Sequence, residues 1–168
     1  MININGSLDT SYRYKMQPLL VKHGGAGNGL YTTINNMEDI SLSLNTPPDI
    51  IYKFISYTLG AAFNEKKKTY TGHHQVSLLQ QIVYQYIDNF VICQSCNIPE
   101  LTYNLNKISS KKSILFSKCS ACGSTNEPKS KNKIHDKCID TIIKYLIKEE
   151  WGNYKGNMVN QDQEDLDI

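Results

Sequence analysis

The chain has 168 residues, of which 40% are hydrophobic, and it carries a formal net charge of +2 at pH 7. This length suits one or two small domains, and the weak net charge excludes a protein that coats nucleic acid over its whole surface, so any RNA contact must come from a local patch. No apolar run approaches the roughly 20 residues of a membrane-spanning helix, and the N-terminus lacks the pattern of a secretory signal.

Residues 1–16 are polar and aromatic without a helical or strand period, which predicts a flexible N-terminal arm. An α/β domain is expected over residues 17–90. It opens with two short strands, Leu19–Lys22 and Leu30–Ile34, joined by a glycine-rich turn at Asn28-Gly29. No Gly-Lys-Ser/Thr sequence follows these glycines, so the pattern favours a hairpin loop over a nucleotide-binding loop.

Three helices are predicted in this domain from caps and apolar spacing. The first covers Met37–Leu44 behind Asn36 as its N-cap, and the second starts at Pro47-Pro48 and ends at Gly60. The third runs from Val76 to Phe90, where apolar residues recur with helical spacing.

His73-His74 precede the third helix. They could be metal ligands or general bases, but no carboxylate or cysteine lies near them in the sequence. We therefore expect them to cap the helix that follows.

The most specific motif is a pair of Cys-x-x-Cys sequences, Cys93–Cys96 and Cys119–Cys122, separated by 22 residues. Four thiolates close a tetrahedral shell around one ion and leave no position for a substrate, so the pattern predicts a structural zinc ribbon over residues 91–133 with one Zn²⁺ per chain. A redox pair and an iron–sulfur cluster are the alternatives, although nothing else in the sequence indicates electron transfer. Cys138 lies outside both motifs and is expected to be a small buried helix residue.

A C-terminal helix is predicted over residues 134–150, and a disordered acidic tail over residues 151–168. The predicted fold class is therefore α/β: a small mixed α/β domain, a four-cysteine zinc ribbon and a C-terminal helix. Lysines surround the cysteines in the sequence. They could dock the ribbon on RNA or on an acidic protein surface, or they could simply form a solvated face.

A further pattern is an ordered series of short motifs. In chain order these are Tyr12-Arg13-Tyr14-Lys15-Met16, Gly27-Asn28-Gly29, Asn36-Met37-Glu38-Asp39-Ile40, Tyr52-Lys53-Phe54 and Cys119-x-Ala121-Cys122-Gly123. The series resembles the N-terminal part of the eukaryotic translation initiation factor 5 family, over roughly residues 1–145. The order of the motifs, more than any one of them, makes the resemblance specific.

The resemblance implies a protein that stimulates GTP hydrolysis in trans and is not a self-contained enzyme. Its partner would be the initiation factor 2 complex, with its GTPase gamma subunit and initiator tRNA, and the small ribosomal subunit or its RNA could be a further partner. Arg13, the single arginine beside 17 lysines, would act like an arginine finger. Lys15, Lys53 and Asn28 would contact the partner, and the protein would be a cytoplasmic monomer.

Two positions depart from the family pattern. Ala26 and Tyr31 stand where the family has a loop arginine and a strand lysine. The C-terminal helical-repeat domain of the family is also expected to be absent, because the chain ends at Ile168. The alternative function is therefore a non-catalytic binding module or decoy related to the beta subunit of initiation factor 2.

Overall fold

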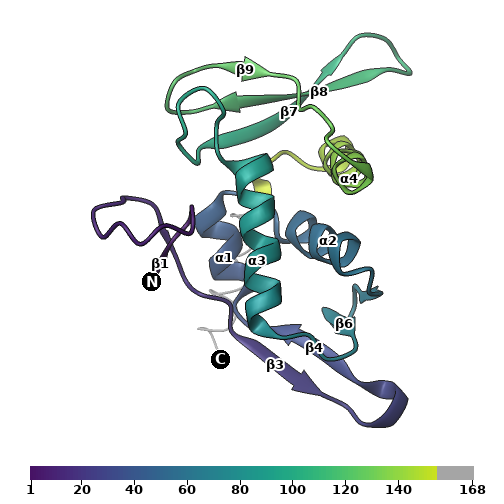
Figure 1. The fold of residues 1–168 in the computed structure, drawn as a ribbon. Helices are drawn as coiled ribbons and strands as arrows, with labels where there is room; N and C mark the ends of the chain where they lie inside the picture. Colours follow the sequence, from purple (N-terminus) through teal and green to yellow (C-terminus); the bar gives the residue numbers. More distant parts are fainter. Residues whose placement is uncertain (155–168) are drawn as a thin grey trace, which may run out of the picture.

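The computed structural model describes residues 1–154, which form a mixed α/β fold with two larger antiparallel sheets at opposite ends and helices between them (Figure 1). One sheet has the strand order β3-β4-β6-β5 and the other β7-β8-β9. The strands of the first are β3 Val21–Gly24, β4 Tyr31–Ile34, β5 Phe63–Asn64 and β6 Thr69–Thr71. Those of the second are β7 Leu101–Lys107, β8 Ser113–Cys119 and β9 Thr125–Asn126. The predicted fold class is confirmed.

The helices between the sheets begin and end largely where the sequence indicates. They are α1 Met37–Leu44, α2 Pro48–Leu59 and α3 Val76–Tyr86. Gly60 ends α2 with a φ of 67°, a left-handed conformation that glycine adopts without strain. None of the helices in residues 1–154 is long and apolar enough to cross a membrane.

Asn36 is the N-cap residue of α1, as predicted, but its side chain makes no capping hydrogen bond. The Asn36 side chain instead accepts a hydrogen bond from the Leu20 N–H at 2.9 Å and donates one to the Pro18 carbonyl at 2.8 Å. The buried amide therefore ties α1 to the segment before β3, because two backbone groups of that segment use Asn36 as their partner.

Helix α3 changes from an α-helix to a π-helix near its C-terminal end. After Tyr86 the chain widens into a π-helical turn, Ile87–Val91, in which the Ile92 N–H donates to the Ile87 carbonyl at 2.9 Å. Phe90 stays buried and stacks on Tyr86, with 5.4 Å between the ring centroids. This turn delivers the chain directly to Cys93.

The first 16 residues contain two short strands, whereas the sequence predicts a flexible arm without regular structure. Strand β1, Ile2–Asn3, pairs antiparallel with β2, Lys15–Met16, and closes the residues between them into a loop. The sequence does not indicate this pairing, because two-residue strands are too short to show a period. Ile4 and Met16 are buried in the core, so hydrophobic burial fixes both ends of the loop.

Helix α4, Lys133–Lys148, packs against both α2 and β7, beneath the ribbon in Figure 1. The packed chain extends beyond this helix, because Trp151 and Tyr154 are buried where an acidic tail was predicted. The Trp151 indole N–H donates to the Asn45 carbonyl at the end of α1, at 2.7 Å. The rest of the predicted tail, residues 155–168, lies outside the described residues.

One hydrophobic core runs through the described residues. It includes Phe54 and Ile55 of α2, Leu115 of the ribbon and Ile142 of α4. The ribbon and the α/β unit therefore share buried apolar surface, and burial of that surface stabilises both.

A candidate metal centre beside the N-terminal loop

Both Cys-x-x-Cys motifs fold into the same backbone turn. In the first, the Cys93 N–H donates to the Ile98 carbonyl at 3.0 Å, and the Asn97 N–H donates to the Cys93 carbonyl at 2.8 Å. The second repeats both hydrogen bonds through Cys119, Gly123 and Ser124, at 3.0 and 2.9 Å. The residue after the second cysteine is left-handed in each case, with φ of 59° at Asn97 and 73° at Gly123. Asparagine and glycine are the residues that tolerate this conformation, which explains their presence there.

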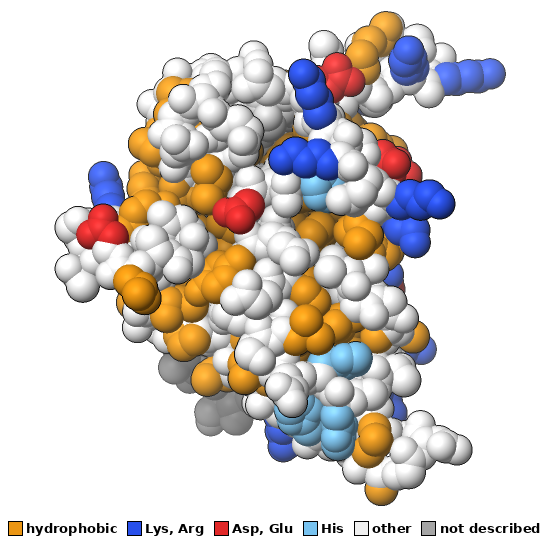
Figure 2. Space-filling model, in the orientation of Figure 1, with side chains coloured by type: hydrophobic (Ala, Val, Ile, Leu, Met, Phe, Trp, Pro, Cys, Tyr) orange, Lys and Arg blue, Asp and Glu red, His pale blue; other side chains and the backbone are white. Residues whose placement is uncertain are grey.

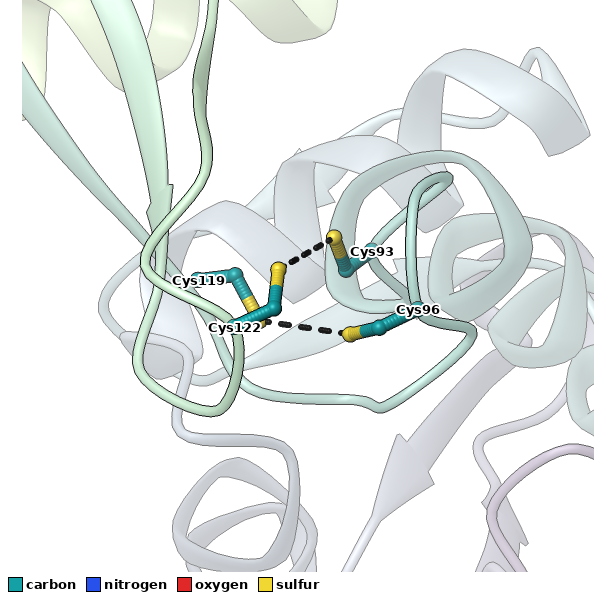
Figure 3. A group of neighbouring side chains, drawn as sticks. All are labelled: Cys93, Cys96, Cys119 and Cys122. Carbon is teal, nitrogen blue, oxygen red and sulfur yellow. Dashed lines mark hydrogen bonds between the residues drawn. The ribbon is translucent and has the colours of Figure 1, made fainter.

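The two turns face each other and direct four sulfurs toward one point (Figure 3). The four Sγ atoms of Cys93, Cys96, Cys119 and Cys122 all lie within 4.8 Å of one another. The Cys93–Cys122 and Cys96–Cys119 separations are 3.8 and 3.6 Å, far longer than the roughly 2.05 Å of a disulfide. The four cysteines are therefore close enough to hold a metal ion.

The electrostatics of the cluster also favour a bound cation. Burial raises the pKa of the Cys93 thiol, but hydrogen bonds from the Ser124 hydroxyl and from backbone N–H groups outweigh burial and lower this pKa to about 6. The Ile98 N–H lowers the pKa of Cys96, yet burial and contact with the other three sulfurs prevail and raise it to about 12. Four sulfurs this close cannot all be thiolates without a positive ion between them.

Asn3 organises the N-terminal loop from within. Its buried side-chain amide donates to the carbonyls of Ser7 at 2.9 Å and Asp9 at 2.7 Å. The Lys15 ammonium donates to the side-chain oxygen, Oδ1, of the same Asn3 amide. Lys15 therefore has a contact within the fold that the sequence did not indicate.

Tyr14 links this loop to the ribbon. The Tyr14 hydroxyl donates to the Glu100 carboxylate at 2.9 Å, and this hydrogen bond raises the pKa of the phenol. The Glu100 carbonyl in turn accepts from the Ser120 N–H, inside the second cysteine turn, at 3.1 Å. The loop that carries Arg13 is thereby attached to the metal centre through two hydrogen bonds.

Arg13 itself is exposed, in the N-terminal loop. Its guanidinium carbon lies 5.9 Å from the centroid of the Tyr14 ring. Among the described residues it has no ion-pair partner. The guanidinium is therefore open to a second molecule.

The other predicted contact residues lie elsewhere. Lys53 is on α2 and forms an ion pair with Glu65 at 2.7 Å. Asn28 is exposed in the 3₁₀ turn Gly27–Gly29, at the far end of the β3–β4 hairpin, which is distant from the N-terminal loop in Figure 1. The structure does not gather Arg13, Lys53 and Asn28 into one site.

The two departures from the family pattern also lie on this hairpin. Ala26 is exposed beside the turn, and Tyr31 pairs across the strands with Gly24. The Tyr31 ring covers Gly24 so closely that a Cβ there would come within 2.3 Å of it. A larger residue at position 24 would therefore displace the Tyr31 ring, which is exposed and free to move.

The two adjacent histidines do not cap α3, which has Gln75 as its N-cap residue and no side-chain cap. They contact sheet carbonyls instead: His73 reaches Gly24 at 3.0 Å and His74 reaches Thr71 at 2.8 Å. The expectation of a capping role is wrong because these rings fold back over the strands rather than forward over the helix.

The fold and site define a class of protein: a small α/β unit that continues through a π-helical turn into a ribbon with four cysteines close enough to hold a metal ion. A family model, described as a domain found in initiation factor 2B and initiation factor 5, matches residues 5–125. The chain belongs to this family.

Individual proteins of known name support the same family assignment. Eukaryotic translation initiation factor 5 of Mus musculus is 39% identical over 127 residues, which are 73% of this chain and 29% of that protein. The proteins of the same name from Caenorhabditis elegans and Saccharomyces cerevisiae are each 37% identical, over 79% and 68% of this chain and 30% and 28% of theirs. The chain thus spans less than a third of the length of these relatives.

Proposed function

We propose that the metal centre holds one structural Zn²⁺, bound by Cys93, Cys96, Cys119 and Cys122. Four Zn–S bonds of about 2.3 Å in a tetrahedron place the sulfurs about 3.8 Å apart. The sulfur separations of 3.8 and 3.6 Å support one such ion, because the cysteines of a cluster of several irons would lie further apart. The ion would close the two turns on each other and would take no part in a reaction, because its shell is complete.

We propose further that the protein is a translation initiation factor 5-like GTPase activator. It would act in trans on the GTPase gamma subunit of an initiation factor 2 complex carrying initiator tRNA. The observation that carries this proposal is Arg13, exposed, without an ion pair in the described part of the chain, and held beside the ribbon in a family member. It would not be an enzyme by itself, since it would supply one group to another protein's active site.

The proposed role of Arg13 follows from its chemistry. A guanidinium is planar, permanently charged and able to bridge two phosphate oxygens. When GTP is cleaved, charge develops between the β- and γ-phosphates, and an arginine supplied from outside stabilises it. Because β1–β2 pairing fixes both ends of the loop, Arg13 would enter the partner's site with little loss of conformational freedom.

Lys15, Asn28 and Lys53 are proposed contacts to the partner complex. They lie on three separate elements, so the interface would be broad. The small ribosomal subunit or its RNA is a further proposed partner, and the protein is proposed to work in the cytoplasm as a monomer. These assignments rest on the family and on the relatives named as translation initiation factors.

A second function has a specific observation in its favour. Ala26 and Tyr31 leave the β3–β4 hairpin without the two basic groups of the family pattern, and the Tyr31 ring lies over Gly24. A protein with a weakened hairpin contact could bind the factor 2 complex without accelerating hydrolysis. It would then be a binding module or decoy related to the beta subunit of initiation factor 2.

Single-turnover GTP hydrolysis separates these functions. Ribosomal initiation complexes loaded with initiator tRNA and GTP are mixed with this protein, and phosphate release and binding are measured together. Activation predicts faster release that saturates with protein concentration. Binding without acceleration would establish the decoy, and absence of both would overturn the assignment to translation.

Tyr14→Phe tests whether the link to the ribbon positions Arg13. We expect acceleration of hydrolysis to fall by about 10- to 100-fold with unchanged binding, because a misplaced catalytic group loses most of its effect. The matched control is Tyr12→Phe, since the buried Tyr12 hydroxyl has no hydrogen-bond partner among the described residues. Equal activity of the two variants would show that the Tyr14–Glu100 hydrogen bond has no positioning role.

A further inference from the structure

A basic groove lies between α2 and α4, away from both the metal centre and the N-terminal loop. It encloses about 560 Å³. Its charged lining consists of Lys53, Lys66, Lys68, Lys144 and Lys148 against Asp49 and Glu65. The space-filling view shows that basic side chains gather on the α4 side of the molecule (Figure 2).

Both carboxylates of the groove are already used within the fold. Glu65 pairs with Lys53 at 2.7 Å, and Asp49 pairs with Lys68 at 3.7 Å. Lys66, Lys144 and Lys148 then have no ion pair within residues 1–154. Three positive charges therefore share one concave surface, and they repel each other unless an anion lies between them.

The lysines of α4 are arranged along one helical stripe. Lys137, Lys144 and Lys148 are separated by seven and four residues, so they lie on the same face and extend over about 16 Å of the helix. The Lys137 ammonium lies 5.7 Å from the centroid of the Tyr57 ring, across from α4 on α2. A row of separated cations suits an anion with charges repeated along its length better than a single small anion.

Aromatic side chains complete the surface. Tyr57 and Tyr145 line the groove and are only partly buried, whereas the Phe63 ring beside them is stacked on Tyr52 within the fold. The Tyr57 hydroxyl is hydrogen-bonded to Thr141 of α4 at 2.7 Å, which fixes the ring between the two helices. Aromatic faces beside lysines bind bases by stacking while the lysines neutralise phosphates.

We propose that this groove binds single-stranded RNA through its phosphate backbone, without sequence specificity. RNA is favoured over an acidic peptide because the groove combines repeated cations with partly exposed rings. An acidic peptide would contact the lysines but has no bases to stack on the rings. Lysine makes point contacts to phosphate and does not read base edges, so shape and charge determine binding. The groove shares Lys53 with the proposed contacts to the factor 2 complex, but RNA binding is measured without any partner protein, so its failure would not bear on GTPase activation.

The test is fluorescence anisotropy with the whole chain and a labelled single-stranded RNA of about 12 nucleotides. The variant K144E/K148E is compared with K111E/K112E, which makes the same charge change at exposed residues of the β7–β8 hairpin tip. The groove variant should bind at least about tenfold more weakly. The slope of log K against log salt concentration should become less steep by about 1.4, since each contact to a single strand contributes about 0.7. The hairpin variant should stay within about twofold of the parent.

Three results would overturn the proposal. Equal loss in both variants would mean that only net charge matters, and a larger loss in the hairpin variant would place RNA on the ribbon. Failure of the parent to bind RNA at low salt, together with binding of a labelled polyglutamate, would identify an acidic protein partner instead. Far-UV circular dichroism of each variant verifies that α4 is intact.

Discussion

Arg13→Ala is expected to abolish the acceleration of GTP hydrolysis, by about 10³- to 10⁵-fold where an arginine supplied from outside operates. Binding to the factor 2 complex and metal content should be unchanged, because Arg13 is exposed and forms no ion pair within the described fold. Single-turnover hydrolysis at saturating protein, measured beside binding of the same variant, provides the check.

The variant Arg13→Lys separates the effect of the planar guanidinium from the effect of its charge. Lysine keeps the charge but loses the planar fork, so it should be nearly as damaging as alanine. Lys112→Ala, which removes an exposed cation from the ribbon hairpin, is the matched control and should retain full activity. Acceleration by Arg13→Ala equal to that of the parent would refute the assignment of Arg13.

Cys119→Ser should lose the bound metal and with it the ordered ribbon. A serine hydroxyl is not a thiolate, and three sulfurs cannot close the tetrahedral shell. The cysteine turns lie at the end of the β7–β8 pair where Leu101 is opposite Cys119, so the ion is expected to hold this end of the ribbon together. Metal analysis and amide dispersion of the ribbon in NMR spectra report the two effects.

Cys138→Ala is the control for the metal prediction. Cys138 is buried in α4, and burial raises its pKa well above the usual range, as expected of an inert thiol in the core. This variant should keep one zinc per chain. Full retention of metal by Cys119→Ser, or a metal other than zinc in the parent, would contradict the proposed centre.

Local signals in the sequence predict the helices and the clustering of the four cysteines well. Met37–Leu44 is found as expected, and Gly60 ends α2, because apolar spacing and a left-handed terminal residue are properties of neighbouring residues. The Cys-x-x-Cys spacing likewise fixes which atoms can meet. The four cysteines that lie together could therefore be identified without a structure.

Contacts between distant residues leave no such local signal. Tyr14 and Glu100 are 86 positions apart, and neither residue type indicates the other. Asn36 looks like a helix cap in the sequence, yet tertiary contacts with Pro18 and Leu20 take its side chain. Strands β7 and β8 pair all the way to the hairpin tip, where Lys107 lies opposite Ser113, and this pairing too joins residues that do not indicate each other in the sequence.

The position of Trp151 gives this protein a built-in optical reporter. It is the only tryptophan, and its ring lies 4.9 Å from that of Tyr103 in the ribbon and 6.4 Å from that of Tyr145 on α4. The indole N–H is also hydrogen-bonded to the end of α1. The fluorophore therefore lies where the ribbon, α4 and α1 meet. Its emission wavelength and quenching by iodide therefore follow the docking of the ribbon onto the helices, without any label.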